Sequence, residues 1–219
     1  MKFLYKYPQR KFPYQDLLDE STRRSRQERE YQLIDTGIFD DDRYWDIFIE
    51  TAKEADDPEE LLFRVTAWNR GPAPAPLHVL PHVWFRNTWA WGREPADTKP
   101  SLRAVEEGMV RTQHPRLGER YILMSPSPGV GSSGRDVMPE MIFTENDTNY
   151  EKMYGGENPT PYVKDAFHRL VVEGEKGAVN PARKGTKCAA WFPFNETGGV
   201  LPGECAGKLC SSPPALSQI

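Results

Sequence analysis

Apolar residues recur at every second position in two stretches of this chain, residues 45–50 and 61–67. The side chains that fall on one side of these stretches are Trp45, Ile47, Ile49, Leu61, Phe63, Val65 and Ala67. Because successive side chains of a β-strand point to opposite faces of its sheet, this spacing predicts two half-buried strands. The repeat therefore favours a sheet, and not a helical bundle, as the core of the fold.

Shorter apolar stretches bounded by Pro, Gly or Asn predict further strands. The first covers residues 77–85 and is interrupted by Pro81, whose missing N–H restricts a strand to a sheet edge or a bulge. With the two alternating stretches it is expected to form an antiparallel meander. Others are expected at residues 121–124, 141–144 and 187–194. Several short strands with few helices are typical of a mainly-β, sandwich-type domain.

Two helices are expected beside the sheets. Pro13 suits the first turn of a helix, which we place at about residues 13–29, with a charged, solvent-facing run after its first turns. An amphipathic stretch from Val163 to Val171 predicts the second helix. No apolar period is visible after residue 197. Residues 1–197 are therefore predicted to form the β-sandwich region and residues 198–219 a disordered tail.

The composition argues against several classes of protein function. The 219 residues include 28 basic and 32 acidic side chains, a formal net charge of −4, and lack the basic excess that nucleic-acid binding requires. No run approaches the ~18 apolar residues of a membrane span, and the first residues are too short and too interrupted for a signal peptide. We therefore expect a cytoplasmic protein that binds neither nucleic acid nor membrane. Its 20 Pro and 17 Gly indicate a turn-rich fold.

The cysteines and histidines specify no metal site. The cysteines are Cys188, Cys205 and Cys210, none of them in a C-x-x-C pair, and reduced thiols are expected. His78 and His82 are four residues apart, but they lie on a predicted strand and lack the intervening Glu of a zinc protease.

Two other patterns resemble ligand sites without the required context. Residues 129–134 fit G-x-G-x-x-G, yet a proline-rich stretch separates them from the preceding predicted strand, which favours a flexible loop. Asp40, Asp41 and Asp42 lack the alternating oxygen ligands of an EF-hand, which favours a solvated turn. No catalytic residue, cofactor or metal is predicted from the pattern.

One tryptophan-rich segment, residues 84–91, has the features of a sugar-binding surface. If it continues the third strand, Trp89 and Trp91 lie on one face, where flat rings stack on sugar rings while Arg86 reaches hydroxyl groups. The candidate substrate-binding residues are therefore Trp89, Trp91 and Arg86. Packing in a core or against another domain explains the same rings, and this alternative stays open.

Seven segments together resemble one known family. They are Met1–Gln9, Leu33–Tyr44, Asn69–Gly71, Leu80–Gly92, Phe143–Asn149, Tyr162–Phe167 and Val179–Arg183. Their order and sequences are similar to the N-terminal β region of large proteins related to family 63 glycoside hydrolases, over about residues 1 to 205. That group resembles mannosyl-oligosaccharide glucosidase and mannosylglycerate hydrolase.

The resemblance implies a partial super-β-sandwich packed on an α/α toroid, with the two catalytic carboxylates of an inverting hydrolase on the toroid. It assigns no catalytic role to Glu140, Glu145 or Asp147. We therefore expect an accessory β-sandwich segment whose partners are a carbohydrate and the toroid of a full-length relative. A free-standing carbohydrate-binding module and a protein-interaction module are the alternatives. The first hypothesis also predicts an unpaired strand edge and an exposed apolar face that normally meets the toroid. The candidates for part of that face are Trp84, Phe85, Trp89 and Trp91.

Overall fold

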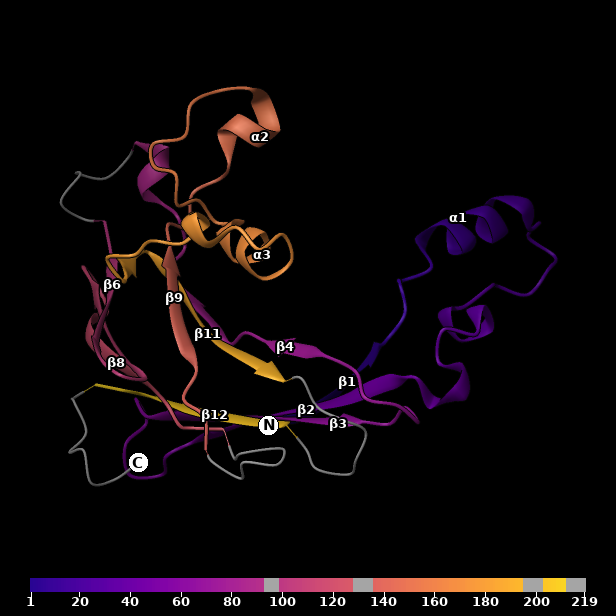
Figure 1. Cartoon of the computed structure of the whole chain (residues 1–219), viewed down its shortest axis with the longest axis horizontal. Coiled ribbons are helices and arrows are strands. Elements are labelled where there is room, and N and C mark those ends of the chain that lie inside the picture. The colour runs from indigo at the N-terminus through magenta and orange to yellow at the C-terminus, as the bar shows by residue number, and fades with distance from the viewer. Residues whose placement is uncertain (93–98, 128–135, 195–202, 212–219) are drawn as a thin grey trace.

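The computed structural model describes residues 1–92, 99–127, 136–194 and 203–211. Within them the chain forms a mainly-β fold of two sheets, as the sequence predicts (Figure 1). The larger sheet has eight strands in the order β1 (Lys2–Pro8), β2 (Tyr44–Lys53), β3 (Leu61–Asn69), β12 (Gly203–Cys210), β8 (Gly118–Met124), β7 (Met109–His114), β6 (Ser101–Glu106) and β10 (Lys184–Gly185). Each neighbouring pair is antiparallel.

The smaller sheet is built around β11 (Lys187–Phe194). One edge of β11 pairs with β9 (Glu140–Thr144), and the other pairs with β4 (Leu77–Val79) and β5 (His82–Trp84). Both short strands keep one register on β11, so they are a single edge strand interrupted near Pro81, as predicted.

The expected meander is wrong in its third member. β2 and β3 pair with each other, but β4 and β5 belong to the smaller sheet. The proline-rich link at residues 72–76 carries the chain away from the larger sheet, because proline cannot donate a backbone hydrogen bond to a neighbouring strand.

The predicted disordered tail is also wrong where the structure describes it. β12 lies in the middle of the larger sheet, paired with β3 on one side and β8 on the other. Two of its core-facing positions are small: Cys205 is buried, and a Cβ at Gly207 would overlap the Phe63 ring. A strand with so little apolar volume lacks the pattern that reveals the other strands. Residues 198–202 and 212–219 lie outside the described residues.

The helices are short. They are α1 (Tyr14–Arg23), α2 (Tyr150–Tyr154) and α3 (Ala166–Val171), with 3-10 turns η1 (Leu33–Thr36), η2 (Asp40–Asp42), η3 (Trp89–Trp91) and η5 (Lys176–Ala178). The N-terminal helix ends before the predicted residue 29 because Arg24 adopts an extended conformation and no apolar face continues past it. Figure 1 shows α1 on an arm away from the sheets and α3 beside the smaller sheet. Among the described residues, no helix is long and apolar enough to cross a membrane.

The core lies between the two sheets. Leu102 and Val110 from the larger sheet, and Phe143 and Ala190 from the smaller one, are fully buried in one cluster. The burial of these apolar faces away from water is the main contribution to the free energy that holds the two sheets together.

The two sheets join along one side only. There, Thr186 N donates to Thr144 O at 3.2 Å, which ties the residue after β10 to the end of β9. A Cβ at Gly185 would overlap the Thr144 carbonyl, so only glycine permits this approach. On the opposite side, where β1 and the β4–β5 strand end the sheets, the sandwich stays open as an apolar cleft.

Candidate functional site

The residues that follow β5 and β9 meet at one end of the smaller sheet. Asp147 Oδ1 accepts two hydrogen bonds, from Asn87 Nδ2 at 2.7 Å and from Trp89 Nε1 at 3.0 Å. The Asn87 amide also donates to Asn146 O at 2.9 Å. The Asp147 side chain is buried, with 8% of the residue exposed, so these donors replace the water that its carboxylate loses.

A second carboxylate extends this cluster. Glu145 Oε2 accepts from Thr186 Oγ1 at 2.7 Å and lies 3.0 Å from Lys99 Nζ. The same ammonium is 3.9 Å from Asp147 Oδ2 and 5.5 Å from the centre of the Trp89 ring. We call Asn87, Trp89, Lys99, Glu145, Asp147 and Thr186 the Trp89 corner. It gathers two carboxylates, one cation, an amide, a hydroxyl and an indole in a small volume.

The prediction that Trp89 and Trp91 share a strand face is wrong. Both lie in η3, which begins where Asn87 Oδ1 accepts from Ala90 N at 3.1 Å and ends at Gly92, whose φ is 64°. Residues two apart on a 3-10 helix point in different directions, since three residues make a turn. The side-chain amide of Asn87 therefore turns the chain before it can continue as a strand.

The three predicted substrate-binding residues consequently divide into two environments. Trp89 is half-buried in the Trp89 corner. Trp91 is 51% exposed, and the Arg86 guanidinium lies 5.1 Å from the centre of its ring. Trp91 and Arg86 thus form an exposed cation–π pair beside the corner, a surface that offers a flat apolar ring and charged hydrogen-bond donors together.

Sequence reasoning did not identify Lys99, Asn87 or Thr186 as members of this cluster. Asn87 and Asp147 do lie within two of the seven family-like segments, and this membership could have identified them as candidate site residues. Lys99 and Thr186 lie outside those segments, so only the fold brings them to Glu145.

The histidines do not converge. His78 Nδ1 accepts from Trp191 Nε1 at 3.1 Å, whereas the His82 ring packs edge-on against Phe167. The described residues hold no group of three or more His, Cys, Asp or Glu side chains arranged for a metal ion.

The other tested patterns also have plain structural roles where they are described. The three cysteines are buried thiols, and burial raises the pKa of Cys188 to about 12. Asp40, Asp41 and Asp42 form the turn η2, as predicted. Residues 129–134 lie outside the described residues.

Among the residues that the structure describes, two of the clefts lie on the larger sheet, away from the Trp89 corner. The apolar cleft has a volume of about 920 Å³ and separates Tyr5, Tyr7 and Ile47 of the larger sheet from Leu77 and Pro81. The other, of about 700 Å³, lies on the outer face of the larger sheet.

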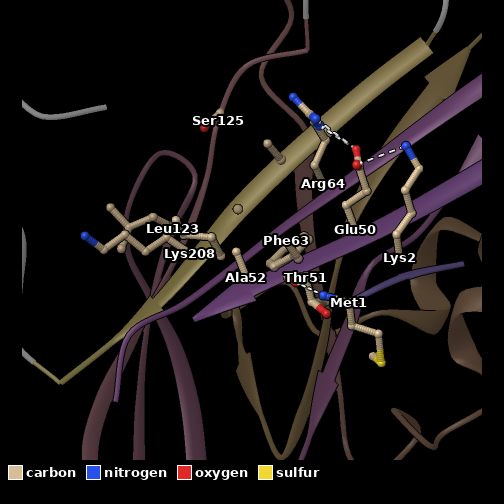
Figure 2. Close-up of a pocket in the computed structure, with 13 residues that line it drawn as sticks. Met1, Lys2, Glu50, Thr51, Ala52, Phe63, Arg64, Leu123, Ser125 and Lys208 are labelled. Carbon is tan, nitrogen blue, oxygen red and sulfur yellow. Dashed lines mark hydrogen bonds and ion pairs between the residues drawn. The ribbon is translucent and has the colours of Figure 1, made fainter. Parts of the chain in front are cut away.

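The charged groups that line the outer cleft already have partners within the protein. Figure 2 shows the Glu50 carboxylate between Lys2 and Arg64, at 3.2 Å and 2.8 Å. Since these groups are already paired, the outer cleft offers less for ligand recognition than the Trp89 corner does.

Comparison with known proteins finds one long relative. In an alignment 225 positions long that covers 93% of this chain, it is 36% identical to the uncharacterized protein YMR196W of Saccharomyces cerevisiae. The chain spans about a fifth (20%) of the length of that relative. No family model matches the chain, and no solved structure matches it.

Proposed function

We propose that this chain is the accessory β-sandwich segment of a protein related to family 63 glycoside hydrolases, and that it supports a sugar site completed by a catalytic toroid outside these 219 residues. In this role the segment itself carries no catalytic carboxylate. The Trp89 corner and the adjoining Trp91–Arg86 pair are its sugar-facing surface.

The observation that supports this proposal is that four of the family-like segments meet around one corner. Leu80–Gly92 and Phe143–Asn149 meet through Asn87, Trp89 and Asp147. Tyr162–Phe167 lies beside them, since Glu145 N donates to Tyr162 O at 2.9 Å. Val179–Arg183 reaches the same strand, because Asn180 N donates to Phe143 O at 2.9 Å. A surface assembled from distant segments is typical of a functional site carried by loops on a rigid sheet.

The length of the yeast relative is a second support. A sequence 36% identical to this one occupies about a fifth of that protein, so this β region occurs as a segment of a much longer chain. The relative is uncharacterized, and the activity therefore rests on the resemblance alone.

Sugar binding is the property to test. We expect α-linked glucose or mannose oligosaccharides to change the tryptophan emission of the chain, because a sugar that stacks on Trp91 removes water from its exposed ring. Trp91→Ala should lose at least tenfold in affinity. The matched control is Trp68→Ala, on β3 away from the corner, which should bind as the wild type does.

The outcomes separate the hypotheses. Emission that no oligosaccharide changes would make Trp89 and Trp91 packing residues and remove the sugar-binding role. Tight binding by the chain alone would favour the alternative of a free-standing carbohydrate-binding module, which the exposed Trp91–Arg86 pair also fits.

A further inference from the structure

Strand β1 leaves one edge of the larger sheet unpaired among the described strands. Thr51 N donates to Met1 O at 2.9 Å, and Gln9 N donates to Arg43 O at 3.0 Å. Bonded positions alternate along an antiparallel pair, so the odd-numbered residues of β1 direct their backbone groups toward β2. The even-numbered residues therefore direct theirs toward the open edge.

The inner face of β1 is aromatic and exposed. Phe3, Tyr5 and Tyr7 are 48%, 54% and 45% exposed, and the two tyrosines line the apolar cleft. Their neighbours across the sheet, Ile49 and Ile47, continue the same apolar surface. Such a surface beside an open strand edge is a typical site for pairing with another strand.

The usual protections of an edge strand are weak here. Lysines on an edge commonly prevent pairing, but Lys2 is held by Glu50 at 3.2 Å (Figure 2) and Lys6 by Asp46 at 2.7 Å. The register with β2 is continuous from Lys2 to Pro8, without a bulge. Proline occurs only at the last position, so the edge is regular, and both of its lysines already have carboxylate partners.

We propose that a second copy of this chain pairs with this edge, β1 against β1, in antiparallel orientation about a two-fold axis at Tyr5. In this register Leu4 lies opposite Lys6 of the other copy, and the two exchange both backbone hydrogen bonds. Tyr5 lies opposite Tyr5, and Phe3 opposite Tyr7, which places aromatic side chains in direct cross-strand pairs. The competing register, centred on Leu4, would place Lys2 opposite Lys6 and bring like charges together.

A dimer of this kind closes on itself and covers the exposed rings. A two-fold axis uses the same surface on both copies, so the β1 edge of neither copy is left over for further growth. Both apolar clefts open on the same side of the joined sheet, where the aromatic rings of each copy exclude water from those of the other.

The first test is the mass of the chain in solution. We expect sedimentation equilibrium to give twice the 25.0 kDa mass of one chain. Leu4→Pro should give a monomer, because it removes an N–H that points to the open edge and none that binds β2. Leu4→Ala keeps that N–H and should stay dimeric. A wild type that is monomeric at all concentrations, or equal association of the two variants, overturns the proposal.

A cysteine variant tests the register and does not depend on the folding of Leu4→Pro. Residues opposite each other at a non-bonded position have Cα atoms about 4.5 Å apart, within the range of a disulfide. Tyr5→Cys should therefore form a disulfide-linked dimer on mild oxidation, whereas Leu4→Cys should not. The wild type is the blank, since its three cysteines are buried. Linkage through Leu4→Cys, or through neither variant, contradicts this pairing.

Discussion

At the scale of the residue, the clearest energetic feature is a carboxylate held between two cations. Asp46 of β2 accepts from Lys6 Nζ at 2.7 Å and from Arg70 Nε at 2.8 Å, and only 9% of its side chain is exposed. Burial raises the pKa of Asp46, but the hydrogen bonds from Lys6 and Arg70 outweigh it and leave the pKa below its ordinary value. The side chain thus joins β1, β2 and the end of β3 only while it is ionised.

Asp46 predicts how stability depends on pH. Because its pKa is lower in the folded state, its contribution is complete above the unfolded pKa of about 3.9 and is lost as the pH falls through the folded value. Asp46→Asn should lower the free energy of unfolding by about 1–3 kcal/mol at pH 7, since it leaves two cations without their partner. Below pH 4 the difference from the wild type should shrink.

Urea denaturation at several pH values measures this effect. Asp41→Asn is the control, because Asp41 pairs with Arg10 while its side chain remains 67% exposed, and such pairs contribute little. A difference between Asp46→Asn and the wild type that is constant from pH 3 to pH 7 would contradict the assignment.

At the scale of the element, the sequence predicts strands by the apolar volume on their inner face. β2 and β3 carry large apolar residues at two-residue spacing, and β11 is a short apolar stretch bounded by turn residues; these patterns predict all three strands. β12 gives a weaker signal, because Cys205 and Gly207 occupy two core-facing positions with little volume, and this is possible only because Phe63 occupies the space above Gly207. β1 has the same two-residue period in Phe3, Tyr5 and Tyr7, so its signal was available.

The sequence predicts three residues at or beside the candidate site, but not how these residues are arranged. Trp89, Trp91 and Arg86 do lie close in sequence and near a polar cluster, but the turn η3 separates the two rings into different environments. That turn depends on the Asn87 side chain, and Lys99 joins through a contact between segments far apart in the chain. Neither the η3 turn nor the Lys99 contact produces a local pattern in the sequence, so neither can be predicted from it.

The junction of the two sheets depends on a single small residue. Gly185→Ala should destabilise the fold by about 1–3 kcal/mol, because the added methyl group meets the Thr144 backbone and cannot rotate away. Gly177→Ala is the matched control, since nothing lies within 4 Å of the Cβ it would add. Thermal unfolding of both variants compares them. Equal midpoints would show that the junction can relax to admit a side chain.

At the scale of the whole molecule, the sandwich is closed where β10 meets β9 and open where β1 faces the β4–β5 strand. Of the residues expected on an exposed apolar face, Trp84 and Trp91 are exposed, whereas Phe85 packs against the core and Trp89 lies in the Trp89 corner. Among the described strands, β1 has an open edge on the open side of the sandwich, beside exposed aromatic side chains. The sugar-facing surface that we propose lies elsewhere, at the Trp89 corner. The two proposals therefore concern separate surfaces, and we expect a variant that abolishes sugar binding to leave self-association unchanged, and the reverse.

The separate catalytic domain of the proposal predicts that this chain alone hydrolyses no glycoside. Inverting hydrolysis requires one carboxyl group to donate a proton and another to activate water. Glu145 and Asp147 instead share Lys99 and accept hydrogen bonds from Thr186, Asn87 and Trp89. The measurement is release of glucose or mannose from α-linked oligosaccharides. Release that disappears in Glu145→Gln or Asp147→Asn would place the chemistry in this chain.

The central place of β12 has a consequence for how the protein is made. β3 and β8 do not pair directly, since β12 lies between them and contributes the hydrogen bonds to both. A ribosome completes residues 203–210 after the other described strands of this sheet, so the larger sheet stays in two halves until β12 has been made. Pairing between segments so distant in sequence is slow. During that interval each half of the larger sheet exposes the strand edge that β12 later pairs with. Unpaired strand edges are prone to aggregation, so this is the interval in which chaperone binding protects the chain most.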